Sequence, residues 1–405
     1  MKPRVLYLSP FEPWARENGS SVVIADLLAG LAGATDEVDV LPFYIRNPPP
    51  GVRSGTPSIP NGMTLGIEPL PKWFSVPIAL ATGRAPWWEV RWNDRALARR
   101  IAREARARDF TPSVVHVEHL VLVPIGRFLA RTFGCPLVYR AHNIESQLYK
   151  RVLGQGSALK RAFVRRLELR EASAIRACDL TLCISDVDLR WVRANVPDAT
   201  AEVLPVGLQL DRFEAPQRDI VPDRICFVGG LDWPPNEVGL RWFVDNVLPT
   251  VLERAPGTHL AVLARGSDAR AWLTGHPSIR LMPGDSRPAE LFASSRVSIA
   301  PLLEGGGVRV KILESLAAGC PVVATSIGGE GLELQGLVHT DDPAAFARAC
   351  LRHLETPVEG SRSALQRALA TNHGADVIAR SLVGRWLATC GVHATIPGPA
   401  VSGRG

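Results

Sequence analysis

The sequence predicts an α/β protein with two open, parallel-sheet domains. Three observations lead to this prediction. Short apolar runs typical of buried strands alternate with longer stretches of helical periodicity. The alternation breaks near 207–221, where prolines appear, and then restarts. A chain of 405 residues, 46% of them hydrophobic, is long enough for two domains with separate cores.

The first half is expected to form one parallel sheet, because its strands alternate with crossover helices. Residues 46–70 are rich in Pro, Gly and Ser and predict irregular structure. The predicted strands are Val5–Ser9, Val38–Pro42, Val114–Val117, Pro136–Arg140, Leu180–Ile184 and Ala201–Pro205. The predicted helices are Ser20–Ala34, Asp94–Ala107, Leu120–Phe133 and Glu145–Ala177.

The second half repeats the same alternation. Its predicted strands are Ile225–Val228, His259–Leu263, Ile279–Met282, Val297–Pro301, Pro321–Thr325 and Leu337–His339. Its predicted helices are Glu237–Glu253, Val308–Ala318, Pro343–His353, Ala364–Ala370 and Ala375–Thr389. We expect domains at 1–207 and 208–375, and a terminal helix within 376–405 that returns to the first domain before a flexible tail. Ligands are expected in a cleft between the domains, beyond the carboxyl ends of the strands.

Charge and cysteine usage narrow the class of protein. The formal net charge of +6 suits an anionic small molecule or an anionic membrane surface, and is too small to indicate nucleic acid. Seven cysteines without a CxxC pair predict a reducing compartment. The N-terminal apolar stretch is too short for a signal peptide, and no apolar run approaches the length of a membrane span. We therefore expect a cytoplasmic protein.

The most informative stretch runs from Pro301 to Glu314, where a buried strand leads into three glycines and then a helix. Glycines let backbone amides approach a ligand, and the first helical turn offers unpaired N–H groups. We therefore expect Gly305–Gly307 to cradle phosphate, with Arg309 in the first turn adding a guanidinium. Lys311 and Glu314 share a helix face. Lys311 could neutralise a diphosphate, while Glu314 accepts hydrogen bonds from ribose hydroxyls. The alternative is an ordinary glycine-rich loop followed by a solvated Lys311–Glu314 pair.

The stretch 225–335 resembles the family 4 glycosyltransferases. The resemblance rests on Phe227-Val228-Gly229-Gly230-Leu231, Gly305–Glu314, Ala317–Thr325 and Gly328-Gly329-Glu330-Gly331-Leu332. It implies the GT-B fold, in which two Rossmann-like domains face each other across a cleft. It also implies the retaining transfer of a sugar from a nucleoside-diphosphate sugar, with Glu314 on the donor ribose. Gly229, Gly230 and Gly305–Gly307 would then lie against the donor.

The chain departs from the family pattern in two places. Family members often carry a second carboxylate where this chain has Gly306, so Glu304 is the nearest substitute for the residue that reads the donor sugar. Many members also place an Arg and a Lys shortly after the glycine that corresponds to Gly229. This chain has Trp-Pro-Pro-Asn in that stretch, so Arg309 and Lys311 are expected to supply the positive charge.

The first half is expected to bind the acceptor. His142 ends a predicted strand, and such a histidine could donate to or orient a hydroxyl in the cleft. The resemblance places the equivalent histidine near donor sugar and acceptor. Gly19 resembles the family's glycine-rich loop, although a helix start capped by a neighbouring polar residue explains it as well. Asn143 and Glu145 are weaker candidates that could instead cap the following helix.

We expect no catalytic metal and no cofactor beyond the sugar donor itself. His116 and His119 lack a third ligand nearby in the sequence. The acidic pair Asp186 and Asp188 follows a serine at a helix start, where carboxylates complement the helix dipole. Basic stretches at 71–108 and 160–171 combine arginines with apolar residues, which is compatible with an anionic membrane surface or with ordinary solvated helices.

The function predicted from these features is glycosyl transfer to a hydroxyl of a saccharide or lipid-linked acceptor, in cell-surface polysaccharide or glycolipid synthesis. His142, Arg309 and Lys311 are the expected catalytic residues. The alternative is a nucleotide-sugar-binding subunit without catalysis, which the missing carboxylate at Gly306 keeps open. An epimerase would need a cluster of carboxylates and histidines. A nicotinamide dehydrogenase would need a GxGxxG loop, which is missing after the first strand.

Overall fold

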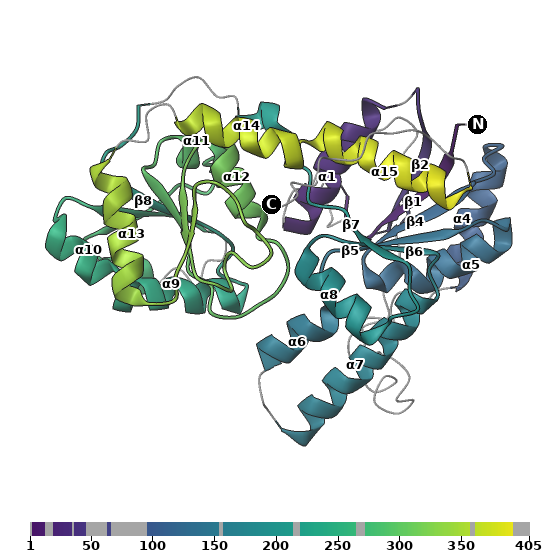
Figure 1. The fold of residues 1–405 in the computed structure, drawn as a ribbon, viewed down its shortest axis with the longest axis horizontal. Helices are drawn as coiled ribbons and strands as arrows, with labels where there is room; N and C mark the ends of the chain where they lie inside the picture. Colours follow the sequence, from purple (N-terminus) through teal and green to yellow (C-terminus); the bar gives the residue numbers. More distant parts are fainter. Residues whose placement is uncertain are drawn as a thin grey trace, which may run out of the picture. The chain divides into compact units, whose positions relative to one another are not determined.

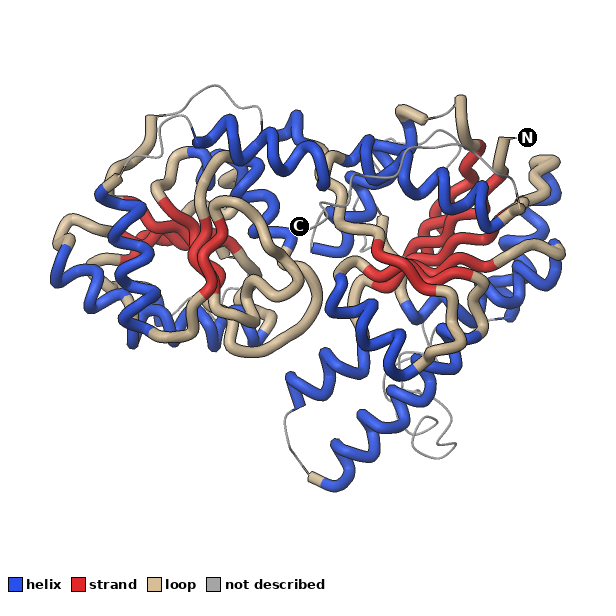
Figure 2. Tube along the Cα trace, in the orientation of Figure 1, coloured by secondary structure: helices blue, strands red, loops and turns tan. Residues whose placement is uncertain are grey.

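The computed structural model describes residues 2–12, 19–34, 36–45, 63–65, 95–153, 157–213, 219–264, 272–356 and 361–391. The chain divides into two compact units. The first unit comprises Met1–Gln209 together with Ala375–Gly405, and the second comprises Leu210–Gly374. In each unit, helices lie on both sides of a central sheet (Figures 1 and 2).

The first unit contains a seven-stranded sheet with the order β3-β2-β1-β4-β5-β6-β7, in which every pair is parallel. Its strands are β1 (Arg4–Ser9), β2 (Asp39–Ile45), β3 (Met63–Leu65), β4 (Val114–Glu118), β5 (Leu137–Ala141), β6 (Leu180–Cys183) and β7 (Ala201–Val203). Its helices are α1 (Gly19–Ala32), α4 (Arg95–Ala107), α5 (Val123–Phe133), α6 (Glu145–Leu153), α7 (Ala158–Arg176), α8 (Asp186–Asn195) and α15 (Ala375–Thr389), with a 3₁₀ turn at Leu120–Leu122.

The two faces of this sheet bury separate cores. Leu6 and Leu8 of β1 pack with residues of α4 and α5, whereas Val5 and Tyr7 pack with residues of α1 and α15. This alternation follows from the two-residue period of a strand that is covered on both faces.

The second unit contains a six-stranded parallel sheet with the order β10-β9-β8-β11-β12-β13. Its strands are β8 (Arg224–Val228), β9 (His259–Leu263), β10 (Ile279–Leu281), β11 (Val297–Ala300), β12 (Val322–Ala324) and β13 (Leu337–His339). Its helices are α9 (Pro234–Asn246), α10 (Leu248–Arg254), α11 (Pro288–Ala293), α12 (Val310–Ala317), α13 (Pro343–Glu355) and α14 (Ser361–His373), with a 3₁₀ turn at Leu210–Phe213.

Three predicted elements need correction. The stretch 46–70 was expected to be irregular, but its residues Met63–Leu65 form β3 beside β2, a strand too short to leave a sequence pattern. The helix predicted over 145–177 is two helices, α6 and α7. The helix predicted over 237–253 starts earlier, at Pro234, and divides into α9 and α10, with Pro249 in the first turn of α10.

The C-terminal helix α15 belongs to the core of the first unit. Its Trp386 is fully buried, and α15 packs along α1. None of the helices in the described ranges is both long and apolar enough to cross a membrane.

Close packing of α1 against the start of α15 makes Gly30 sensitive to substitution. A Cβ at Gly30 would lie 2.3 Å from the carbonyl oxygen of Ala375. Overpacking costs about 1–3 kcal/mol, and a 2.3 Å contact with backbone places Gly30 toward the upper end of that range. This cost exceeds the roughly 1 kcal/mol that Ala gains over Gly in helix propensity. We expect Gly30→Ala to lower the free energy of unfolding, measured by urea denaturation. Gly33→Ala is the control, because the nearest atom to its Cβ lies 3.4 Å away; equal effects of the two changes would contradict this packing.

Candidate functional site

Each sheet has one position at which the strand order changes direction, so that the chain continues to one side from one strand and to the other side from its neighbour. The candidate residues lie in the loops that follow these two strands. In the second unit β8 and β11 are the central neighbours, and chain connections leave them in opposite directions. Gly229 and Gly230 follow β8, and the loop 301–309 follows β11. Ligands of open α/β sheets bind at such positions, because the two loops diverge and leave room between them.

The loop between β11 and α12 depends on its glycines. Gly305 and Gly307 have φ angles of +115° and +77°, a region that residues with a Cβ rarely adopt. A Cβ at Gly305 would also lie 2.7 Å from Nη2 of Arg309. The backbone at this point is therefore restricted to glycine.

Arg309 does not lie where the sequence predicts. The helix begins at Val310, so Arg309 is its N-cap residue, with φ −83° and ψ 94°, and is not in the first turn. Its guanidinium folds back over the loop, and Nη1 donates a hydrogen bond to the carbonyl oxygen of Gly306 at 2.6 Å. Arg309 thus braces the glycine loop as well as placing positive charge beside it.

Lys311 is directed at the loop that follows β8. Its Nζ donates to Oδ1 of Asn236 at 2.9 Å and lies 4.6 Å from the ring centroid of Phe227. Nδ2 of Asn236 in turn donates to the carbonyl of Gly230 at 2.8 Å. Burial, together with the nearby charge of Arg309, lowers the pKa of Lys311 to about 7. From the sequence, Asn236 was recognised only as the last residue of Trp-Pro-Pro-Asn. Its bridge between Lys311 and the carbonyl of Gly230 was not predicted.

Glu314 forms its ion pair with Arg212, at 3.3 Å, and Lys311 takes no part in it. The Glu314 side chain is 13% exposed. The alternative of a solvated Lys311–Glu314 pair is therefore wrong. Arg212 comes from the 3₁₀ turn at the start of this unit, 102 residues away, and the sequence offers no signal for it.

The motifs that follow β12 hold the glycine loop in place. The Thr325 hydroxyl donates to the carbonyl of Leu302 and accepts from the N–H of Gly328. A Cβ at Gly328 would lie 2.0 Å from the carbonyl oxygen of Ala300. Glu304 is half-buried, and it has no ion pair within the described part of the chain.

In the first unit the strand order reverses between β1 and β4, and β5 lies next to β4. His142 follows β5, but its ring is not free to project outward as predicted. The residue is only 4% exposed, and its Nε2 lies 2.5 Å from Oε2 of Glu118, the last residue of β4. A residue of the neighbouring strand therefore forms a hydrogen bond with one of the two ring nitrogens of His142.

Glu118 is itself fully buried. Burial alone would raise the pKa of its carboxyl group, but the charge of Arg140, the nearby His142 and the hydrogen bonds from His116 and His142 outweigh this effect, so its pKa lies well below the usual range. Nη1 of Arg140 is 3.7 Å from Glu118. Glu118 was not predicted from the sequence, although a carboxylate directly after the predicted strand Val114–Val117, at the strand end where ligands are expected, was a signal that could have identified it.

The remaining candidates of the first unit lie at helix starts. Glu145 opens α6, and its N–H donates to Oε1 of Glu171 at 2.7 Å. Burial, and secondarily Glu171, raises the pKa of Glu145 to about 7, while Asn143 hydrogen-bonds its carboxylate. Gly19 is the exposed first residue of α1. The N–H groups at the start of α6 are therefore capped by Glu171, and not by Asn143 or Glu145.

No group of three His, Cys, Asp or Glu side chains in the described ranges is placed to hold a metal ion. Asp188 is engaged at the start of α8. Its N–H donates to Oγ of Ser185 at 3.2 Å, and its carboxylate accepts from the same hydroxyl at 2.6 Å. The acidic pair at 186 and 188 therefore belongs to a helix cap.

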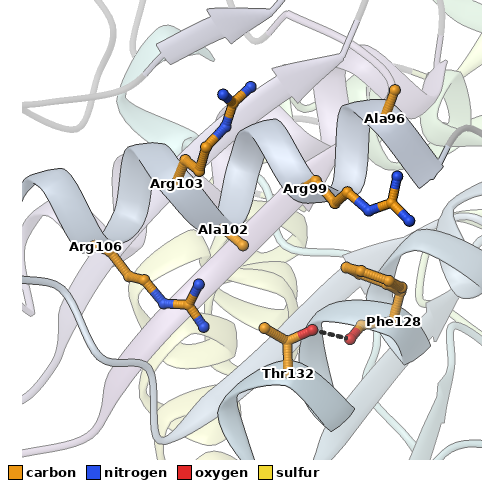
Figure 3. A pocket seen from close by; sticks show the side chains of 7 residues that line it. All are labelled: Ala96, Arg99, Ala102, Arg103, Arg106, Phe128 and Thr132. Atoms are coloured by element: carbon orange, nitrogen blue, oxygen red, sulfur yellow. Dashed lines mark hydrogen bonds between the residues drawn. The ribbon is translucent and has the colours of Figure 1, made fainter.

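A basic groove of about 530 Å³ lies between α4 and α5, apart from these loops (Figure 3). Arg99, Arg103 and Arg106 line it from α4, and Phe128 and Thr132 line it from α5. Because the arginines are four and three residues apart, they share one face of the helix.

Two family models match the chain in succession. The model described as Glycosyltransferase Family 4 matches residues 17–212, and the model described as Glycosyl transferases group 1 matches residues 222–356. Each match coincides closely with one of the two sheet-containing units.

Curated relatives match parts of the chain. It is 28% identical over 154 residues to an uncharacterized 44.6 kDa protein in the cps region of Klebsiella pneumoniae. It is also 28% identical over 192 residues to a phosphatidyl-myo-inositol mannosyltransferase of Mycobacterium leprae. These alignments cover 35% and 44% of this chain and 39% and 50% of the two relatives. The chain thus spans half or less of the length of these relatives.

Solved structures match nearly the whole chain. Sucrose-phosphate synthase from Thermosynechococcus elongatus has a TM-score of 0.61 at 16% identity, over 96% of both chains. HepE of Anabaena in complex with UDP has a TM-score of 0.63 at 14% identity, over 96% of this chain and 100% of HepE. The predicted GT-B fold is confirmed by these likenesses.

The lowered pKa of Lys311 predicts a pH-dependent affinity for polyanions. The ammonium form attracts an anion, so affinity is greatest below pH 7 and falls as Lys311 deprotonates. We expect inorganic pyrophosphate to bind the natural protein about tenfold more weakly at about pH 8.5 than at about pH 6.5, once the change in affinity seen with Lys311→Met over the same pH range is subtracted. The variant controls for the titration of pyrophosphate itself. Parallel pH profiles of the two proteins, measured by calorimetry, would contradict the assignment.

Proposed function

Because this chain belongs to the family 4 glycosyltransferases, we propose that it moves a sugar from a nucleoside-diphosphate sugar to a hydroxyl acceptor with retention of configuration. The observation that carries the proposal is the half-buried Lys311 beside the loop Gly305–Gly307. An ammonium group at this position has no carboxylate partner within the described ranges, and a diphosphate would supply the missing negative charge.

The donor would be held by residues of the second unit. Amides of the glycine loop and the charge of Lys311 and Arg309 suit the diphosphate. Glu314 suits the ribose hydroxyls, and its partner Arg212 fixes the carboxylate in place. HepE, a solved structure of the same fold, binds UDP, which supports a nucleoside-diphosphate donor here.

Retention requires the acceptor to attack the sugar face from which the diphosphate leaves. In this mechanism no side-chain nucleophile takes part, and an oxygen of the leaving phosphate accepts the proton of the acceptor hydroxyl. Charge then develops on the diphosphate, and Lys311, Arg309 and the loop amides stabilise it. The hydrogen bond from Arg309 to Gly306 keeps these groups in position before the reaction begins.

The acceptor class follows from the relatives. One lies in a cps region and another is named for mannosyl transfer to phosphatidyl-myo-inositol, so we assign this chain to cell-surface polysaccharide or glycolipid synthesis. The first unit, with His142, would bind the acceptor. Catalysis without a metal ion is part of the proposal, because two cationic side chains already face the phosphate position.

Removing the ammonium group tests the catalytic assignment. We expect Lys311→Ala to lower turnover at least about tenfold, a loss of roughly 1.4 kcal/mol of transition-state stabilisation, and to weaken donor binding. Turnover is measured with UDP-glucose first, and then with other nucleoside-diphosphate sugars, by release of the nucleoside diphosphate. Lys160→Ala on the exposed face of α7 is the control.

Two results would oppose this assignment. Near-normal kinetics of Lys311→Ala would remove Lys311 from the mechanism. Donor binding by the natural protein without any transfer or donor hydrolysis would favour the alternative of a non-catalytic nucleotide-sugar-binding subunit.

We also propose that the protein works in the cytoplasm at the inner face of the membrane, with the arginine face of α4 against anionic lipid. Arg99, Arg103 and Arg106 are exposed, line the groove between α4 and α5 (Figure 3), and form no ion pair with any described residue. The predicted tryptophan-containing part of this surface, 71–94, lies outside the described residues.

A vesicle experiment tests the membrane proposal. We expect binding to vesicles containing phosphatidylglycerol and little binding to pure phosphatidylcholine. The triple change Arg99→Gln, Arg103→Gln and Arg106→Gln should weaken binding by roughly 1 kcal/mol per arginine. The control changes three exposed arginines of the second unit, Arg241, Arg287 and Arg348, to Gln. Flotation that is independent of anionic lipid would exclude this surface.

A further inference from the structure

The carboxyl ends of β4 and β5 enclose a polar cluster around Glu118, inside the first unit. Its Oε2 accepts a hydrogen bond from Nε2 of His142 at 2.5 Å. Its Oε1 is 2.7 Å from the hydroxyl of Tyr7 and 3.1 Å from Nε2 of His116. Both Glu118 and Tyr7 are fully buried, so water cannot substitute for any of these contacts.

The hydrogen-bond pattern determines which nitrogen of each histidine carries the proton. The indole N–H of Trp386 lies 3.2 Å from Nδ1 of His116, and because an indole can only donate, this Nδ1 must accept. His116 therefore carries its proton on Nε2 and donates to Glu118. A carboxylate only accepts, so Tyr7 and His142 donate to it in the same way.

The surrounding charges keep this arrangement in place. Arg140 and the hydrogen bonds stabilise the ionised carboxylate of Glu118, as described above. Burial, opposed in part by Glu118, lowers the pKa of His142, which keeps the imidazole neutral. A neutral imidazole that donates through Nε2 has its lone pair on Nδ1. Among the described residues nothing forms a hydrogen bond with Nδ1 of His142.

His119 fixes the plane of the His142 ring. The two rings stack with centroids 4.0 Å apart and an angle of 18° between their planes. His119 has φ +69° and ψ 147°, a conformation that is costly for a residue with a Cβ. Strain of this kind persists only where surrounding contacts enforce it, and here it brings the His119 ring over His142.

We propose that Glu118 is a positioning residue that holds His142 in its Nε2–H form, so that His142 accepts a hydrogen bond from a substrate hydroxyl through Nδ1. The inference rests on the proposed glycosyl transfer for the identity of the hydroxyl, which belongs to the sugar donor or the acceptor. It reverses the expectation from the sequence that His142 could donate to a hydroxyl. A ligand that offers only acceptor atoms at this position would be rejected.

The protonation state can be read without any activity. Two-dimensional ¹⁵N–¹H spectra of histidine-labelled full-length protein distinguish the two neutral forms, and the His142 signals are assigned by their loss in His142→Gln. We expect the Nε2–H form in the natural protein. Tyr7→Phe, which removes only a contact to Oε1, should leave that form unchanged. A His142 signal from the Nδ1–H form, or from a doubly protonated ring at neutral pH, would overturn the proposal.

A pair of isosteric variants tests the role in turnover. In His142→Asn the amide oxygen can replace Nδ1, whereas in His142→Gln the amide replaces Nε2 and keeps the contact with Glu118. With UDP-glucose or whichever donor is active, we expect kcat/KM of the Asn variant to exceed that of the Gln variant at least about tenfold. Melting temperatures verify that both variants fold.

The possible outcomes distinguish a failure of the proposed role of Glu118 from a failure of the proposed glycosyl transfer. Equal losses in the two variants, or better retention by His142→Gln, would mean that the contact with Glu118 is only structural and would overturn the proposal. If the natural protein transfers no sugar at all, the proposed function fails, while the NMR spectra still decide whether His142 carries its proton on Nε2, as the contact with Glu118 requires.

Discussion

The second unit is organised around a half-buried ammonium group that no described carboxylate neutralises. A buried charge is costly unless it is paired, and the chain reduces this cost in two ways. Asn236 accepts a hydrogen bond from Lys311, and the ring of Phe227 lies close to the charge. The remaining cost of burial, with the charge of Arg309, lowers the pKa of Lys311 to about 7. A site prepared in this manner gains the full pairing energy only when an anion arrives, which suits it to bind and release a diphosphate.

The first unit buries a charge of the opposite sign and neutralises it internally. Glu118 is a buried carboxylate, and Arg140, Tyr7 and two histidines surround it. These partners satisfy the charge without any ligand, so the cluster is rigid before substrate binds. The proposed roles differ accordingly, because Lys311 would pair with a ligand charge, whereas Glu118 would act on the ligand only through His142.

Rigidity of the loops matters as much as the charges. Thr325 holds Leu302 and Gly328, Arg309 holds Gly306, and Asn236 holds Gly230. The contacts of Thr325 with Leu302 and of Asn236 with Gly230 join different segments at carboxyl strand ends, and the other two brace a loop from within. Groups that are held before the reaction need no reorganisation when charge develops, which is the main advantage of such sites over flexible ones.

The sequence by itself determined the alternating strands and helices and the glycine loop between β11 and α12, because apolar periodicity and glycine runs are local properties. It could not place Arg309 outside the helix, since the first helical residue depends on how the loop closes. Only the tertiary structure decided the partners of Lys311, Glu314 and His142. Those partners lie 75, 102 and 24 residues away, so only the packing of the folded units brings them together.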